Sequence, residues 1–218
     1  MERNMNSTRL GLLLLTFLLI APGCATQDMV VTPGYAGPAK VTRDRMAEHM
    51  QYRGFAILRP ADPRWYFRYG EQNPLTALFR LEVSSPAHSF FGSVRHQRLP
   101  TAPGTPGAFK EYVDAEMKRL GPRHELVAYE SEVTTLQGQP CVRYKQRVWD
   151  RAAVGADEPL LMTVVGFHVI HPTWERTVIV ASYSERVPKD EVAGNLDGVG
   201  ADFLSRVVLE SAPGVKLK

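Results

Sequence analysis

Cys141 is the residue best suited to nucleophilic chemistry in the body of the chain. It lies in the run Pro-Cys-Val-Arg-Tyr-Lys-Gln-Arg, and on a strand its side also carries Arg143, Lys145 and Arg147. Nearby cations lower a thiol pKa, which would allow a nucleophilic or redox role. No particular histidine can be placed beside this thiol from the sequence, and buried cysteines are common. The pattern therefore favours a semi-buried structural cysteine over a catalytic one.

The histidines do not form a metal-binding pattern. His168 and His171 are three positions apart, and on a strand such positions point to opposite faces. Pro172 could bend the chain there, yet no further cluster of His, Cys or carboxylates stands nearby. We expect no metal and no cofactor. The remaining histidines are isolated from one another: His49, His88, His96 and His124.

The densest aromatic stretch is a candidate ligand surface. It runs Trp-Tyr-Phe-Arg-Tyr, and as a strand it places Trp65, Phe67 and Tyr69 on one side. These rings could line a groove for a lipid, a glycan or a peptide. The alternative, which the composition favours, is ordinary packing of aromatic side chains in the core.

Motifs that signal particular enzyme classes are missing from the sequence. It contains no phosphate-cradling glycine loop, G-x-S-x-G, S-x-x-K, H-E-x-x-H or C-x-x-C. This lowers the expectation of an enzyme without removing it, because an active site built by tertiary geometry leaves no local pattern. An enzyme using Cys141 remains the less favoured alternative.

Size and charge narrow the class of protein further. The 218 residues fit one ordinary domain, and 44% hydrophobic with 22% charged residues is the mixture of a folding chain. The formal net charge of +3 is small and scattered, so we expect no nucleic-acid partner.

The beginning of the chain predicts export. A short polar start carrying Arg3 and Arg9 precedes an uncharged apolar run over residues 10–21. A helix that spans a bilayer needs about 20 apolar residues, so this run is too short for a permanent anchor. The combination is typical of a secretory signal peptide, predicted over residues 1–23. A helix of the core is the disfavoured alternative.

The residues after the apolar run resemble the lipobox of bacterial lipoproteins. They read Ala21-Pro22-Gly23-Cys24, and the family implies cleavage between Gly23 and Cys24 with acylation of the cysteine. Ala21 stands where leucine is usual, and Pro22 is unusual at its position. Ordinary cleavage after the small residues 21–23 is the alternative. Ala25 after the cysteine points to the outer membrane by resemblance to the sorting of such lipoproteins.

The next segment fits a tether followed by one domain. Residues 24–40 are rich in Pro and Gly and have little periodicity, so we expect a flexible linker with a reach of about 20–24 Å. A first strand at residues 29–31 is the alternative. The folded domain is predicted over residues 41–212, with a tail at 213–218.

A hairpin is the clearest local prediction inside the domain. With Gln137-Gly138 as a two-residue turn, Val133 faces Val142 and Val127 faces Val148 on one side. The other side pairs opposite charges, Glu132 with Arg143 and Glu130 with Lys145. A shift of one residue would spoil both sides, so this register is favoured.

Periodicity predicts the remaining elements. Strands are expected at residues 54–58, 75–83, 90–96, 160–170 and 177–183, and helices at 43–50, 105–121 and 196–209. Residues 160–170 are apolar on both faces, which is typical of a strand in the middle of a covered sheet. We therefore expect an α+β fold, an antiparallel sheet of about six to eight strands with helices packed against it as an α/β/α sandwich.

Three short motifs carry a resemblance over residues 53–209. They are Gly-Phe-x-Ile early, Gly-x-Pro-Cys-Val-Arg in the middle, and Val-Ile-Val-Ala-Ser-Tyr-Ser-Glu-Arg-Val before the last helix. In this order they resemble the α/β/α sandwich of the photosystem II oxygen-evolving extrinsic subunit family and related bacterial lipoproteins. The resemblance implies an accessory or binding scaffold, although a shared fold does not fix a function.

Taken together, the sequence predicts a lipid-anchored envelope protein that faces the periplasm from the outer membrane. Its domain is expected to act as a non-catalytic accessory or binding module, with the membrane and an envelope protein as partners. The alternative is a periplasmic carrier of a lipid or other apolar ligand, which would use the groove at Trp65, Phe67 and Tyr69.

Overall fold

A computed structural model describes residues 48–68, 76–81, 88–152 and 158–210. The predicted signal peptide, Cys24, the tether, Tyr69 and the C-terminal tail lie outside these ranges. Within them, no helix is long and apolar enough to cross a membrane.

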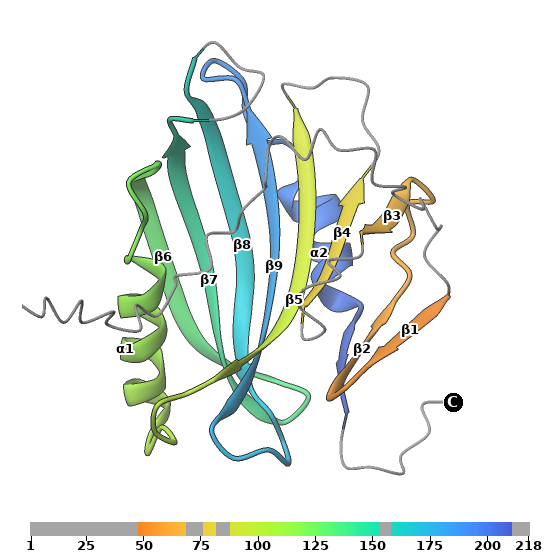
Figure 1. Cartoon of the computed structure of the whole chain (residues 1–218), viewed down its shortest axis with the longest axis vertical. Helices are drawn as coiled ribbons and strands as arrows, with labels where there is room; N and C mark the ends of the chain where they lie inside the picture. The colour runs from red at the N-terminus through yellow and green to blue at the C-terminus, as the bar shows by residue number, and fades with distance from the viewer. Residues whose placement is uncertain (1–47, 69–75, 82–87, 153–157, 211–218) are drawn as a thin grey trace, which may run out of the picture.

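The fold is α+β and centres on a seven-stranded antiparallel sheet (Figure 1). The strand order is β3-β4-β5-β9-β8-β7-β6. The strands are β3 (Trp65–Arg68), β4 (Thr76–Leu81), β5 (Ser89–Arg98), β6 (His124–Leu136), β7 (Gln139–Asp150), β8 (Leu160–Ile170) and β9 (Thr177–Val187). As predicted, β8 has a neighbour on each side, and nearly all its side chains are buried because both faces of the sheet are covered there.

A small second sheet and a short helical segment cover one face. The sheet has the order β1-β2-β10, from β1 (His49–Tyr52), β2 (Phe55–Leu58) and β10 (Val207–Leu209). A π-helical turn, η1 (Leu196–Gly200), leads into α2 (Ala201–Ser205) just before β10. Gly200 lies against the ring of Tyr183, so a side chain at this position would collide with the sheet.

Two of the helix predictions were wrong in part. The helix predicted over residues 196–209 ends at Ser205, and Val207–Leu209 is a strand because it pairs with β2. The helix predicted over residues 43–50 is contradicted at its end, where His49–Tyr52 is a strand that also pairs with β2. β10 is held by a partner far away in the sequence, whereas β1 forms a hairpin with β2, its neighbour along the chain.

The helix α1 (Pro106–Met117) packs on the opposite face against β6 and β7, and lies beside β6 at the left edge of Figure 1. The predicted cap is confirmed, since the Thr105 hydroxyl accepts a hydrogen bond from the Ala108 N–H at 3.1 Å. Phe109 and Val113 are buried against Val142, Val178 and Val180 of the sheet.

The predicted hairpin register is confirmed from the turn to Ala128. Glu132 pairs with Arg143, Glu130 with Lys145, and Val133 with Val142. Gln137 and Gly138 both have positive φ (50° and 79°), as a tight two-residue turn requires. The predicted pair of Val127 with Val148 is wrong, because the register shifts between Leu126 and Ala128 and Leu126 faces Val148 instead.

Candidate functional site

Cys141 is fully buried in the larger hydrophobic cluster. Burial raises its thiol pKa to about 12, and the charge of Arg143 offsets this only in part. The thiol is therefore protonated at neutral pH and hidden from solvent, so it offers no accessible nucleophile. Its place agrees with a structural cysteine, more deeply buried than the sequence suggested.

Trp65, the first residue of the candidate aromatic ligand surface, is buried in the structure. Trp65 is 1% exposed, and its ring stacks on Phe203 with centroids 5.0 Å apart. It also meets Tyr183 edge-on at 6.2 Å. Phe67 belongs to β3, but its side chain, like the whole of Tyr69, lies outside the described part of the chain. Trp65 is thus a core residue, and a groove lined by this ring is not available on the surface.

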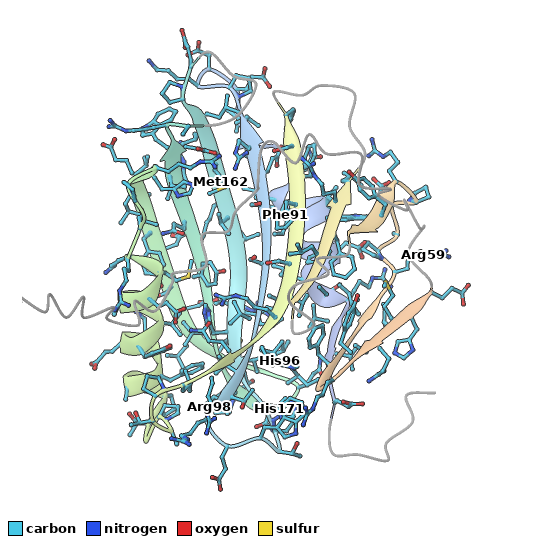
Figure 2. The ribbon with its side chains drawn as sticks, viewed as in Figure 1. Arg59, Phe91, His96, Arg98, Met162 and His171 are labelled. Carbon is cyan, nitrogen blue, oxygen red and sulfur yellow. The ribbon has the colours of Figure 1, made fainter. Side chains whose placement is uncertain are left out.

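The side chains of His168 and His171 lie in different parts of the fold, as their spacing predicted. His171 lies beyond the end of β8, where Nδ1 accepts hydrogen bonds from the N–H groups of Thr173 and Trp174, at 3.2 and 3.1 Å. Its Nε2 donates to the Gly54 carbonyl at 3.2 Å. Figure 2 shows His171 at the same end of the sheet as His96. These bonds hold two turns together, which is a structural role.

His168 is fully buried beneath α1, between Val142 and Val180 of the adjacent strands. Neither of its ring nitrogens has a hydrogen-bond partner. Burial, reinforced by the positive charge of Arg95, lowers its pKa to about 3, so the ring is neutral. Among the described residues, no three His, Cys, Asp or Glu side chains are grouped to hold a metal ion.

A buried carboxylate that the sequence did not signal lies near the other end of β9. Glu185 is fully buried and accepts a hydrogen bond from the Asn195 N–H at 3.0 Å. His88 Nε2 lies 2.8 Å from its other oxygen. These contacts join His88, just before β5, and Asn195, just before η1, to β9, so Glu185 has a structural role.

The predicted hairpin carries its charged pairs on one face of β6 and β7. Side chains alternate, and Tyr129 and Ser131 turn toward α1, where both hydroxyls donate to Asp114 Oδ1, at 2.8 and 2.6 Å. The opposite face of the two strands therefore carries the charged residues, all exposed: Glu130, Glu132, Arg143, Lys145 and Arg147.

This charged face is shallow and open. A depression of about 430 Å³ is bordered by residues of both strands, among them Glu130, Glu132, Arg143 and Lys145. Cross-strand pairing sets each glutamate opposite one basic residue. We call this surface the β6–β7 face, defined by Glu130, Glu132, Arg143, Lys145 and Arg147.

The β6–β7 face ends at an outer strand. In the described sheet β6 has a neighbour on one side only, namely β7. Three of the five exposed large hydrophobic side chains of the described residues belong to it: Leu126, Val127 and Val133. The sequence could predict the hairpin but not that β6 lies at an edge, because the order of strands depends on contacts between distant segments.

Comparisons with known proteins reach only the fold. No protein-family model matches the sequence, and no curated protein matches it. Among solved structures, the chain is similar to the Ran-binding protein Mog1p of Saccharomyces cerevisiae, at 11% identity over 76% of this chain and 96% of Mog1p, with a TM-score of 0.43. A Mog1 variant gives 12% identity, 73% and 93% coverage and a TM-score of 0.42.

The chain is also similar to CyanoP, the cyanobacterial PsbP of Synechocystis sp. PCC 6803. The identity is 18% over 81% of this chain and 98% of CyanoP, and the TM-score is 0.34. PsbP is the kind of protein that the three sequence motifs resemble. With identities and TM-scores this low, these likenesses concern the fold alone.

Proposed function

We propose that this protein is a non-catalytic binding module that docks a protein partner on the β6–β7 face. The observation that carries the proposal is the state of that face: five charged side chains of both signs are exposed on a shallow surface beside an outer strand. A shallow surface of mixed charge can be complemented by opposite charges on a protein partner, whereas small ligands are held in concave, mostly apolar pockets.

Burial of the other candidate functional residues, Cys141 and Trp65, also favours the β6–β7 face as the binding surface. Cys141 is a protonated thiol inside the core, and Trp65 is packed between aromatic rings. A catalytic thiol and an aromatic carrier groove would each require these side chains to be reachable. The charged hairpin is therefore the candidate that remains accessible.

We further propose that the module is held at a bacterial membrane by acylated Cys24, facing the periplasm from the outer membrane. The support is the sequence: the apolar run at residues 10–21, the residues Gly23-Cys24 and the Pro/Gly-rich segment that follows. Each buried methylene of an acyl chain contributes about 0.8 kcal/mol, so two or three chains hold a protein firmly.

Docking on the β6–β7 face is tested by site-specific crosslinking in cells. A photo-crosslinking residue replaces Ala128, which is exposed beside this face, and a control chain carries it at Glu191. We expect a discrete adduct from position 128 that the double variant Glu130→Lys/Glu132→Lys reduces at least tenfold. The matched control Glu175→Lys/Glu191→Lys changes the net charge equally and should leave the adduct intact.

Two results would contradict docking on this face. An adduct of equal yield from position 191 would mean nonspecific capture. An adduct that survives the reversal of Glu130 and Glu132 would mean that the partner binds elsewhere.

The anchor is tested by the intact mass of the protein extracted from membranes, beside Cys24→Ala. We expect the mature chain to begin at Cys24 with added acyl mass. The variant should lose both processing and tight membrane association. A soluble, unacylated wild type would refute the anchor without affecting the docking face.

A further inference from the structure

The pairing of β6 with β7 fixes which backbone groups of β6 point outward. Thr135 faces Pro140, and proline has no N–H, so this pair cannot exchange two hydrogen bonds. Antiparallel pairs alternate between hydrogen-bonded and non-hydrogen-bonded positions. The pairs of Val133, Ser131 and Tyr129 are therefore also non-hydrogen-bonded. The N–H and C=O groups of these three residues point away from β7, toward the open side of the sheet.

These outward groups are unused in the described structure. No hydrogen bond among the described residues involves the backbone of Tyr129, Ser131 or Val133 on this side. Val133 is 44% exposed, which leaves the strand accessible where its edge is open. A row of unpaired N–H and C=O groups is a ready template for another strand.

Charge disfavours a second copy of β6 that pairs about Ser131 as the occupant. Two β6 strands that pair antiparallel about Ser131 would set Glu130 of one chain directly opposite Glu132 of the other. Like charges directly opposite one another destabilise a sheet. A strand that carries positive charge at alternate positions would meet Glu130 and Glu132 favourably on the same side. On the other side of the sheet, it would place its remaining side chains beside Val133.

We propose that β6 accepts an extended segment of a protein partner as an added strand, with Lys or Arg opposite Glu130 and Glu132 and β-branched apolar residues opposite Val133. This inference rests on the proposed docking at the β6–β7 face and names its occupant. Backbone hydrogen bonds supply the binding, and the alternation of basic and apolar side chains supplies the selectivity.

Hydrogen exchange on the full chain tests the added strand directly. The probe is the capped peptide Lys-Val-Lys-Val-Lys-Val. Controls are the same peptide with Glu in place of Lys, and a block peptide Lys-Lys-Lys-Val-Val-Val of equal composition. We expect the alternating peptide to slow exchange of the outward amides of Tyr129, Ser131 and Val133 at least tenfold. Attachment through charge alone would not protect these amides.

A backbone variant tests the same point by affinity. Val133→Pro removes one outward N–H and leaves the hydrogen bonds to β7 in place, a substitution that edge strands tolerate. We expect it to weaken binding of the alternating peptide at least tenfold. Val133→Thr retains the N–H and should bind like the wild type. The exchange measurement needs no variant, so a folding defect in Val133→Pro would not hide the answer.

The outcomes separate this inference from the proposed function. Suppose that Glu130→Lys/Glu132→Lys abolishes both the cellular adduct and peptide binding. If Val133→Pro still binds the alternating peptide like the wild type, and the peptide does not slow exchange of the outward amides, docking holds and the added strand is refuted. Equal binding of the block peptide, or no binding of the alternating peptide at millimolar concentration, would also refute it. A cellular adduct that still forms when Glu130 and Glu132 are both replaced by Lys would refute the docking proposal itself.

Discussion

The two faces of the seven-stranded sheet are covered in different ways. Toward α2 and the small sheet, contact is aromatic: the Phe203 ring stacks on Trp65 and meets Phe79 with centroids 5.6 Å apart. Toward α1, the buried helix residues are only Phe109 and Val113, and much of the contact is polar. There Gln146 Nε2 donates to the Met117 carbonyl at 2.6 Å.

The two faces therefore have different roles: one supplies stability to the domain, and the other orients α1 on the sheet. Aromatic burial is strong but not directional, so the α2 face should supply most of the free energy of unfolding. Hydrogen bonds contribute less on balance but require definite geometry, so the polar contacts of the α1 face fix where that helix lies on β6 and β7. The following experiments test this comparison.

The largest effect is expected on the aromatic face. Phe203→Ala removes a fully buried ring and leaves a cavity between Trp65 and Phe79, so it should lower the free energy of unfolding by about 3–5 kcal/mol. Urea unfolding followed by circular dichroism measures it. Val192→Ala, at a position 87% exposed, is the control and should change stability by less than about 0.5 kcal/mol. A loss below about 1 kcal/mol for Phe203→Ala would contradict the comparison.

The next effect concerns a buried ion-pair network on the α1 side. Asp150 is fully buried, accepts hydrogen bonds from Arg123 at 2.5 and 2.7 Å, and forms an ion pair with Arg186 at 2.9 Å. Asp150→Asn leaves two guanidinium groups without their counter-charge and should cost about 3 kcal/mol by urea unfolding. Asp62→Asn breaks an exposed pair with Arg64 and should cost less than about 1 kcal/mol.

The same network predicts a dependence on acid. Burial disfavours the charged form of Asp150, but the hydrogen bond from Arg123 and the charges of both arginines outweigh it, so its pKa lies below the ordinary value. Its stabilisation is therefore present above the ordinary carboxyl pKa and is lost as the pH falls through the lowered one. Asp150→Asn should flatten the acid limb of the stability profile, and an unchanged limb would argue against the network.

A smaller, local effect is expected where α1 meets β6. Asp114 accepts from Tyr129 and Ser131 and pairs with Lys110 at 2.6 Å. Asp114→Asn should cost about 1 kcal/mol and raise hydrogen exchange in α1 more than in β8. Glu111→Gln, on the exposed side of the helix, is the matched control. Uniform faster exchange throughout the domain would mean that Asp114 does not act locally.

The smallest effect at neutral pH is expected at His168. Removing a buried ring with two unpartnered nitrogens, as in His168→Leu, should raise stability by about 1 kcal/mol. Because the folded pKa is about 3, the unfolded chain takes up a proton as the pH falls below its own value near 6.5. The His168 ring should then cost the wild type up to about 1.4 kcal/mol per pH unit between these values, and this part of the acid slope should be absent from the variant.

Thermal or urea unfolding from pH 7 to pH 4 compares the two chains. A variant that is less stable than the wild type at pH 7 would mean that the imidazole makes a favourable contact.

The hairpin and the start of α1 could be predicted because their signals are local, whereas α1 ends at Met117, before the predicted end at residue 121. Turn residues, alternating charges and a threonine cap act over a few positions. Val207–Leu209 could not be assigned correctly, because its apolar residues suit a helix as well as a strand and β2 decides between them.

The candidate site was predictable only in part. Its charged pairs, Glu130 with Lys145 and Glu132 with Arg143, follow from the hairpin register alone. The open edge of β6 does not, since it requires the order of all seven strands. Trp65 was a candidate for a binding surface but is a packing residue. Its packing partner could not be predicted from the sequence, because Phe203 is distant along the chain.

The pairing of β2 with β10 also bears on when the domain can fold. The Gly54 N–H donates to Glu210 at 2.8 Å across 156 positions, and Leu209 pairs with Phe55. Contacts so distant in sequence form slowly, and these cannot form until residues 209 and 210 have been synthesised. Throughout translation, Phe55 and Ile57 would therefore remain without their final cover, and the chain would stay open.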